Sequence, residues 1–166
     1  MPQLAGEDIL ASDINIPKYI SKAASQSVTS STVYVNDNDF SFTLPVGTYR
    51  IELVASATAV APVGTADIKM KWVNTGTMSL IGRATLGSGT AATSVTTATV
   101  RIQQLNLGTD AAYGLNASNW IIREDLLIDV TVSGVLTLQW AQNASNATPT
   151  TLNSTSRVYI TLLEAF

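Results

Sequence analysis

The run Gly47-Thr48-Tyr49-Arg50-Ile51-Glu52-Leu53-Val54-Ala55-Ser56-Ala57 decides the fold class. Apolar side chains recur at every second position from Tyr49 to Ala57, and polar or charged side chains fill most positions between them. Successive side chains of a β-strand point to opposite faces. The alternation therefore predicts a strand with one face on a core and the other in water.

The same period of two recurs along most of the chain. It is clear at 68–72 and 136–140, and further strands are predicted at 32–35, 40–44, 78–86, 95–105, 121–132 and 157–164. Turn-forming stretches rich in Gly, Pro, Asn, Asp or Ser separate these segments, notably 35–39, 44–47, 86–89 and 142–156. About nine short strands with this spacing indicate an antiparallel all-β sandwich or barrel.

Composition supports one soluble domain and argues against a nucleic-acid partner. The chain has 166 residues, of which 46% are hydrophobic and 13% are charged. That apolar content is enough for one packed core. The net charge is -3 without a basic run, so the electrostatic footprint of a nucleic-acid binder is missing.

The residue types that are absent exclude much of enzymology. The chain has no His and no Cys, so a Ser-His-Asp triad, a thiolate nucleophile and a zinc cluster are excluded. Only carboxylate or Ser-Lys chemistry would remain. Glu124 and Asp125 are adjacent and point to opposite faces of a strand, and nothing selects Glu52 and Asp129 as a facing pair. We therefore expect a protein with no catalytic residue and no cofactor.

Two further charged stretches are interpreted without chemistry. The sequence Asn36-Asp37-Asn38-Asp39 has alternating oxygen ligands, like half of a calcium loop, but lacks the loop Gly and the distant Glu. A turn is the preferred interpretation, and no metal is expected. Lys69 and Lys71 share a predicted strand face with Asp67, which is typical of a solvated surface.

The first 27 residues differ from the rest of the chain. They carry several large apolar side chains, but Pro2 and Pro17 interrupt the segment and it is too short for a core of its own. We predict an arm at 1–27, with one or two helical turns capped by Ser12 or Asp13, and a sandwich at 28–166. No signal peptide or membrane span is predicted, so we expect a protein made soluble in the cytoplasm with no membrane partner.

Three separated segments together resemble a known family. The pieces Leu44-Pro45-Val46-Gly47-Thr48-Tyr49-Arg50-Ile51, Leu136-Thr137-Leu138-Gln139-Trp140-Ala141-Gln142-Asn143 and Arg157-Val158-Tyr159-Ile160-Thr161-Leu162 occur in the order found in jelly-roll modules of phage fibres. They are also similar to the globular heads of tumour necrosis factor and complement-type proteins. The resemblance covers residues 32–166 and implies a β-sandwich of jelly-roll type.

The opening of the chain carries a second resemblance. The stretch Leu4-Ala5-Gly6-Glu7-Asp8-Ile9-Leu10-Ala11-Ser12-Asp13-Ile14-Asn15 resembles the "AGDxIxASDxN" start of minor structural proteins of tailed phages. This resemblance implies an arm that fastens the protein to the virion, and a homotrimer displayed on head or tail. The function expected is that of a non-enzymatic capsid decoration, head fibre or tail-fibre module of the virion. The partners expected are further copies of the chain and other virion proteins of the capsid or tail.

Specific residues are assigned to these contacts. We expect the large apolar side chains of the arm to anchor the protein to the particle: Leu4, Ile9, Leu10, Ile14, Ile16, Tyr19 and Ile20. The closing strand is apolar on both faces, so we expect Val158, Ile160 and Leu162 to form a subunit interface.

One aromatic residue is left for a ligand. Trp72 and Trp140 fall on the apolar side of alternating strands and are expected in the core, whereas Trp120 follows a polar stretch and is kept as a candidate for ligand contact. The alternative function is accordingly an adhesin that binds a receptor or a cell-surface glycan of the host. A carboxylate-dependent glycan hydrolase is the third alternative.

Overall fold

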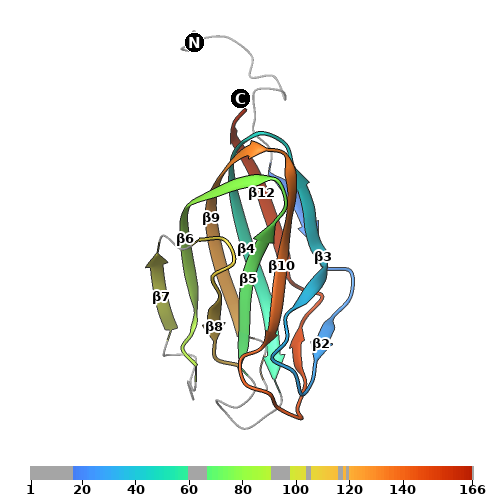
Figure 1. The fold of residues 1–166 in the computed structure, drawn as a ribbon. Coiled ribbons are helices and arrows are strands. Elements are labelled where there is room, and N and C mark those ends of the chain that lie inside the picture. The colour runs from blue at the N-terminus through green and yellow to red at the C-terminus, as the bar shows by residue number, and fades with distance from the viewer. Residues whose placement is uncertain are drawn as a thin grey trace, which may run out of the picture.

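A computed structural model describes residues 17–59, 67–90, 98–103, 106–115, 118 and 120–165, with only the backbone path for 98–103. The described residues form twelve strands and no helix (Figure 1). The strands are β1 (Lys18–Ser21), β2 (Gln26–Val28), β3 (Val35–Leu44), β4 (Gly47–Ala59), β5 (Ile68–Asn74), β6 (Thr77–Ser88), β7 (Ala98–Gln103), β8 (Ala111–Tyr113), β9 (Trp120–Val132), β10 (Gly134–Gln142), β11 (Thr150–Leu152) and β12 (Arg157–Glu164).

The strands form two antiparallel sheets that pack as a sandwich. The large sheet has the order β1-β12-β4-β9-β6-β7, with β11 paired to β4 and β2 paired to β11. The small sheet has the order β3-β10-β5-β8. The prediction of an antiparallel all-β sandwich is confirmed.

The strand order is that of a jelly roll with an inserted hairpin. Without the short strands β2 and β11 and the hairpin β6–β7, eight strands remain. Numbered along the chain, they lie in the orders first-eighth-third-sixth and second-seventh-fourth-fifth. These two four-stranded orders define the jelly roll. The hairpin β6–β7 comes between β5 and β8 and widens the large sheet by two strands.

The core lies between the sheets and is built by the alternation of each strand. In β4, Tyr49, Ile51, Leu53, Ala55 and Ala57 are all buried, as the sequence predicts. Trp72 and Trp140 are completely buried, which confirms their predicted place in the core.

One end of the sandwich holds both ends of the described chain and is called the terminal end here. It comprises Pro17, Ala165 and the turns at 44–47, 74–77 and 132–134 (Figure 1). Gly47 has φ +149°, and a Cβ there would lie 2.6 Å from the backbone oxygen of Glu164. The predicted turn at 44–47 therefore depends on glycine because the last strand passes so close.

The predicted arm ends too late in the sequence. Lys18–Ser21 pairs with β12, with Tyr19 opposite Tyr159 and Ile20 opposite Val158, and Gln26–Val28 pairs with β11. Residues 18–27 thus belong to the sandwich, with 18–21 and 26–27 in its strands. Residues 1–16, including the predicted caps, lie outside the described residues.

Candidate functional site

The predicted anchoring residues fall into two groups. Leu4, Ile9, Leu10, Ile14 and Ile16 lie outside the described residues. Tyr19 is 52% exposed on the outer face of the large sheet, with its ring 5.4 Å from that of Tyr159, and Ile20 packs against the core from the inner face. Tyr19 and Ile20 are therefore structural parts of the sheet edge, and only Tyr19 has a surface to offer a partner.

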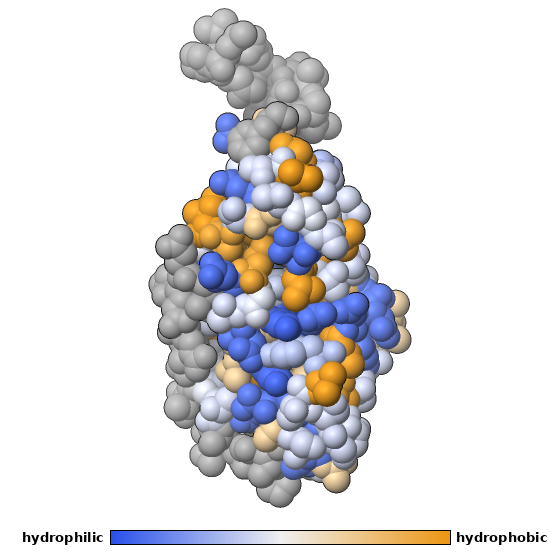
Figure 2. Space-filling model, in the orientation of Figure 1, coloured by the Kyte–Doolittle hydropathy of each residue, from blue (hydrophilic) through white to orange (hydrophobic). Residues whose placement is uncertain are grey.

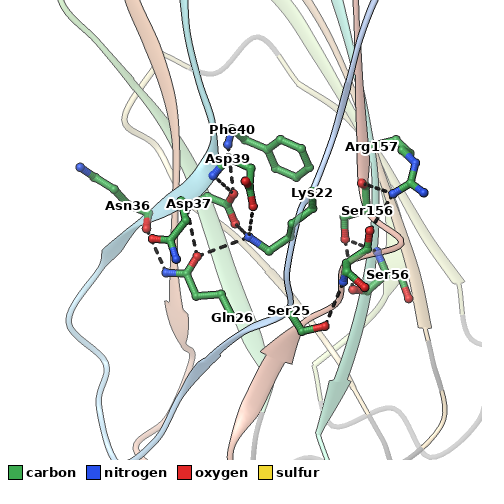
Figure 3. Close-up of polar contacts among 12 residues, drawn as sticks. Lys22, Ser25, Gln26, Asn36, Asp37, Asp39, Phe40, Ser56, Ser156 and Arg157 are labelled. Atoms are coloured by element: carbon green, nitrogen blue, oxygen red, sulfur yellow. Dashed lines mark hydrogen bonds and ion pairs between the residues drawn. The ribbon is translucent and has the colours of Figure 1, made fainter.

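A buried lysine fixes the segment that follows β1. The Nζ of Lys22 lies 2.8 Å from Oδ2 of Asp37 and 3.3 Å from Oδ2 of Asp39 (Figure 3). The side chains of Lys22 and Asp37 have no exposed surface, whereas 21% of Asp39 is exposed. A buried charge is stable only when it is paired and hydrogen-bonded. The N-terminal segment is thus held on β3 by an ion pair, and the loss of either partner would leave an unpaired buried charge.

Hydrogen bonds extend this fastening on both sides of Lys22. Gln26 donates from Nε2 to the backbone oxygen of Asn36 at 3.0 Å and accepts from the backbone N–H of Asn38 at 3.1 Å. Ser25 accepts from the backbone N–H of Ser154 at 3.0 Å (Figure 3). Residues 17–28 are therefore held by the turn in β3 and by the loop before β12 together. We call Lys22, Asp37 and Asp39 the N-terminal latch.

The turn predicted at 36–39 lies inside a strand. Asp37 accepts hydrogen bonds from the backbone N–H groups of Asp39 and Phe40, both at 3.0 Å, which is the local bonding expected of a turn-forming Asp. These residues form an irregularity within β3, where the pairing with β10 shifts register. The lysine ammonium takes the position that the calcium alternative would give to a cation. Within the described ranges, no cluster of three or more potential metal ligands occurs.

A second buried ion pair lies between the sheets. Arg83 on β6 donates to Oε1 of Glu124 on β9 at 2.6 Å, and both side chains are almost fully buried. Glu124 also accepts from the hydroxyl of Tyr113 at 2.5 Å and from Nε1 of Trp72 at 2.8 Å. One carboxylate therefore joins four strands from both sheets.

The ionisation of this cluster follows from its burial. Burial raises the pKa of the Tyr113 phenol, and the neighbouring Glu124 carboxylate raises it further. Burial alone would lower the pKa of Arg83, but the charge and hydrogen bond of Glu124 outweigh it, and the pKa of Arg83 is raised. The arrangement suits a fixed structural cluster, because the raised pKa values keep Arg83 charged and Tyr113 neutral at neutral pH.

The next residue of β9 faces water, as the alternation predicts. Asp125 accepts from Arg50 at 2.6 Å, and Arg50 also reaches Glu52 at 3.1 Å. The hydrogen bond and charge of Asp125 raise the pKa of Arg50. These side chains border an open pocket of about 250 Å³ on the outer face of the large sheet.

Among the described residues, the two carboxylates considered as a facing pair, Glu52 and Asp129, are not brought together. Glu52 lies opposite Asp125 in the sheet, and Asp129 lies opposite Thr48, from which it accepts a hydrogen bond at 2.7 Å. Glu52 and Asp129 therefore do not face each other. Arg50 lies on both Glu52 and Asp125, so neither is an isolated acid.

Two of the predicted sites need correction. Val158 is fully buried and Ile160 is 6% exposed, and both belong to the core of this chain, against which Leu162 packs. This face of β12 is already covered within one chain, and the alternate face, which carries Tyr159, is the one left outside. Trp120 is 5% exposed in the same core. Its ring therefore offers no surface to a ligand, contrary to its candidate role.

Sequence reasoning missed Lys22, Arg83 and Glu124 as buried charges. Glu124 alternates in phase with the buried apolar residues of β9, so the period of two held the signal for it. Arg83 gives no such signal, because the apolar Met78 and Leu80 of β6 lie in the other phase and a register shift between Leu80 and Gly82 precedes Arg83. Lys22 lies between strands and gives no such signal.

No helix of the described part is long and apolar enough to cross a membrane.

Comparisons with known proteins find only distant structural similarity. No protein-family model matches the chain, and no curated protein matches it. Among solved structures it is similar to a chain of infectious bursal disease virus, Gx strain, with a TM-score of 0.21, 12% identity and coverage of 99% of this chain and 46% of that one. It is also similar to the VP2 subviral particle of the same virus, with a TM-score of 0.21, 10% identity and coverage of 99% and 46%. This chain spans less than half the length of those viral chains, and so low a TM-score leaves the fold assignment to rest on its own strand order.

Proposed function

We propose that the chain is a non-enzymatic structural protein of a virus particle, attached through residues 1–16. The proposal starts from the resemblance of residues 4–15 to the start of tailed-phage structural proteins. The N-terminal latch supports it, because the chain that follows this stretch is built into the sandwich by strand pairing and a fully buried ion pair. A segment that attaches the protein to a particle has to be linked firmly to the folded domain, and the N-terminal latch forms that link.

The surface of the terminal end agrees with attachment there. It exposes apolar side chains, with Val46 at 37%, Val132 at 54% and Leu163 at 51%. A pocket of about 340 Å³ lined by Lys18, Pro45, Tyr49, Leu162 and neighbouring residues opens beside the point where residues 1–16 join β1. Exposed apolar side chains gathered at one end are typical of a protein-protein contact.

Deletion of residues 1–16 tests the attachment. The shortened chain keeps Lys22, β1 and β2, so we expect an unchanged circular dichroism spectrum and melting temperature, with loss of the protein from purified particles. Full-length protein added to the same particles is the control. Unchanged occupancy of the shortened chain on the particle would show that attachment does not need this segment.

We further propose that the protein is a homotrimer whose copies meet through the outer face of the large sheet. This face exposes Tyr19, Tyr159, Ile121 and Leu86, each at least 36% accessible, around the Arg50 and Asp125 pair. Arg50 and Arg123 lie on the same face as Glu52 and Asp125, so a rotated copy can present charges of opposite sign. A face of five or more strands has about the area of a standard interface, roughly 800 Å² per partner.

Sedimentation of matched variants tests the trimer. Tyr159→Glu and Ile121→Glu place a charge on the proposed interface and should shift the protein towards the monomer at micromolar concentration. Val33→Glu, at a residue 72% exposed away from this sheet, should leave the trimer intact. A wild-type monomer, or equal effects of all three variants, would refute the proposal.

A further inference from the structure

Two lysines stand side by side on the outer face of the small sheet. Lys69 and Lys71 alternate along β5 with the buried Ile68, Met70 and Trp72, so both point outwards about 6.6 Å apart along the strand. None of the ion pairs among the described residues includes either lysine. Asp67, expected on the same solvated face, is instead buried and accepts from the backbone N–H of Leu115.

A tyrosine gathers the two ammonium groups. The Nζ atoms of Lys69 and Lys71 lie 4.6 Å and 4.1 Å from the centre of the Tyr34 ring. The Tyr34 hydroxyl donates to Oδ2 of Asp110 at 2.6 Å, and burial together with this bond raises the pKa of the phenol. The neutral ring is attractive to both cations, which holds two like charges together without placing a carboxylate between them.

The loop that carries Tyr34 is fixed in place. Ser30 has the positive φ of 52°, which is uncommon for a residue with a side chain. Its backbone N–H donates to the oxygen of Asn146 at 2.8 Å, and the N–H of Ser31 donates to Oε1 of the buried Gln142 at 3.1 Å. Tyr34 is therefore preorganised over the lysines, which reduces the ordering cost of binding a ligand there.

On the side of β10 and β3, the surroundings of the two lysines are polar and uncharged. Gln139, opposite Lys71, donates to Oδ1 of Asn36 at 2.8 Å, and the hydroxyls of Ser41 and Thr137 lie 2.8 Å apart. Figure 2 shows a face on which hydrophilic residues prevail across the middle, with a hydrophobic patch towards the terminal end. Amides and hydroxyls of this kind hydrogen-bond readily to sugar hydroxyls.

We propose that Lys69, Lys71 and Tyr34 bind the acidic groups of an anionic polysaccharide. Two preorganised ammonium groups fit a carboxylate or phosphate, and the amides and hydroxyls beside them fit the sugar. The site lies in the half of the small sheet remote from the terminal end, since Lys69 pairs next to Gln142, the last residue of β10. A protein held at its terminal end would present this site outwards.

Binding of defined polymers tests the site. The full-length protein is titrated by calorimetry with polygalacturonate, which carries carboxylates, with phosphomannan, which carries phosphates, and with neutral dextran. We expect binding to at least one anionic polymer and none to dextran. The chain has a net charge of -3, so general attraction of polyanions is disfavoured and binding has to come from a local patch.

Matched variants assign the binding to these residues. Lys69→Gln/Lys71→Gln should weaken binding at least tenfold. Lys71→Gln alone should weaken it at least threefold, whereas Lys18→Gln, which removes one charge from an exposed position outside the proposed trimer face, should change it less than twofold. Asp110→Asn should strengthen binding about two- to fivefold, because it removes the nearby negative charge while an amide oxygen still accepts from Tyr34. Circular dichroism checks that every variant is folded.

Three outcomes would overturn the proposal. They are no binding of either anionic polymer, equal binding of dextran, and equal losses in Lys71→Gln and Lys18→Gln. A response to only one anionic polymer identifies whether a carboxylate or a phosphate is recognised.

Discussion

The inner and outer faces of the large sheet each carry a carboxylate paired with an arginine, one pair buried and one exposed. The two carboxylates belong to adjacent residues of β9. Glu124 points inwards and its carboxylate, with no exposed surface, binds Arg83, Tyr113 and Trp72. Asp125 points outwards and pairs with Arg50, with 41% and 48% of the two side chains exposed. The distances of the two ion pairs are equal at 2.6 Å. The comparison teaches that burial, and not the distance between charges, decides what an ion pair contributes.

The largest effect is expected on the inner side. Glu124→Gln leaves Arg83 buried without its counter-charge, so we expect the free energy of unfolding to fall by about 3–5 kcal/mol. Chemical unfolding followed by tryptophan fluorescence measures the loss, with Asp125→Asn as the matched control one residue away. A difference of less than 1 kcal/mol between the two variants would break the comparison.

The N-terminal latch extends the comparison to the sheet edge. Lys22→Met leaves the buried Asp37 carboxylate without its cation, so we expect the free energy of unfolding to fall by about 3–5 kcal/mol. The fall is smaller if the segment around β1 and β2 detaches before the sandwich unfolds. Hydrogen exchange separates the two cases, because only local detachment exposes the amides of β1 ahead of those of β4. The double variant Lys22→Met/Asp37→Asn should recover part of the loss. No recovery would mean that the unpaired charge of Asp37 is not the source of the loss.

The sequence predicts most of the sandwich and little of its charged interior. The alternation places nearly every core residue of β4 and β9, and the opposite directions of Glu124 and Asp125 follow from it directly. The alternation does not reveal which buried carboxylate finds which cation, because Arg83 and Glu124 are 41 residues apart and meet only through the order of the strands. The arm boundary was misplaced for the same reason, since β1 and β2 are short edge strands whose partners lie at the far end of the chain.

An alkaline titration sharpens the comparison further, with a smaller effect. The pKa of the Tyr113 phenol is raised above the usual 10.0 in the folded chain, so its folded form keeps the proton that the unfolded chain releases. The stability from this group is fully present below about pH 10 and is lost as the pH rises, by at most about 1.4 kcal/mol per pH unit. Melting temperatures between pH 8 and 11 should therefore fall less steeply in Tyr113→Phe, although that variant starts lower. Tyr34 adds a second slope, because the pKa of its phenol is raised as well. Equal slopes in Tyr113→Phe and the wild type would exclude Tyr113 as a source.

The smallest effect is expected on the outer side. In a single copy of the chain, Asp125→Asn removes the partner of Arg50 in a setting where water and salt already screen both charges, so we expect a loss of about 0.2–1 kcal/mol there. Glu52 stays within 3.1 Å of Arg50 and takes over part of the pairing, which lowers the loss further. The measurement is chemical unfolding at low salt and at 0.5 M salt, where the wild type and the variant should converge. A loss that persists at high salt would mean that the pair is shielded from solvent. If the protein is a trimer through this face, that shielding comes from a second copy. Repeating the measurement in the Tyr159→Glu background, where the copies should separate, then returns the small, salt-sensitive value of an exposed pair.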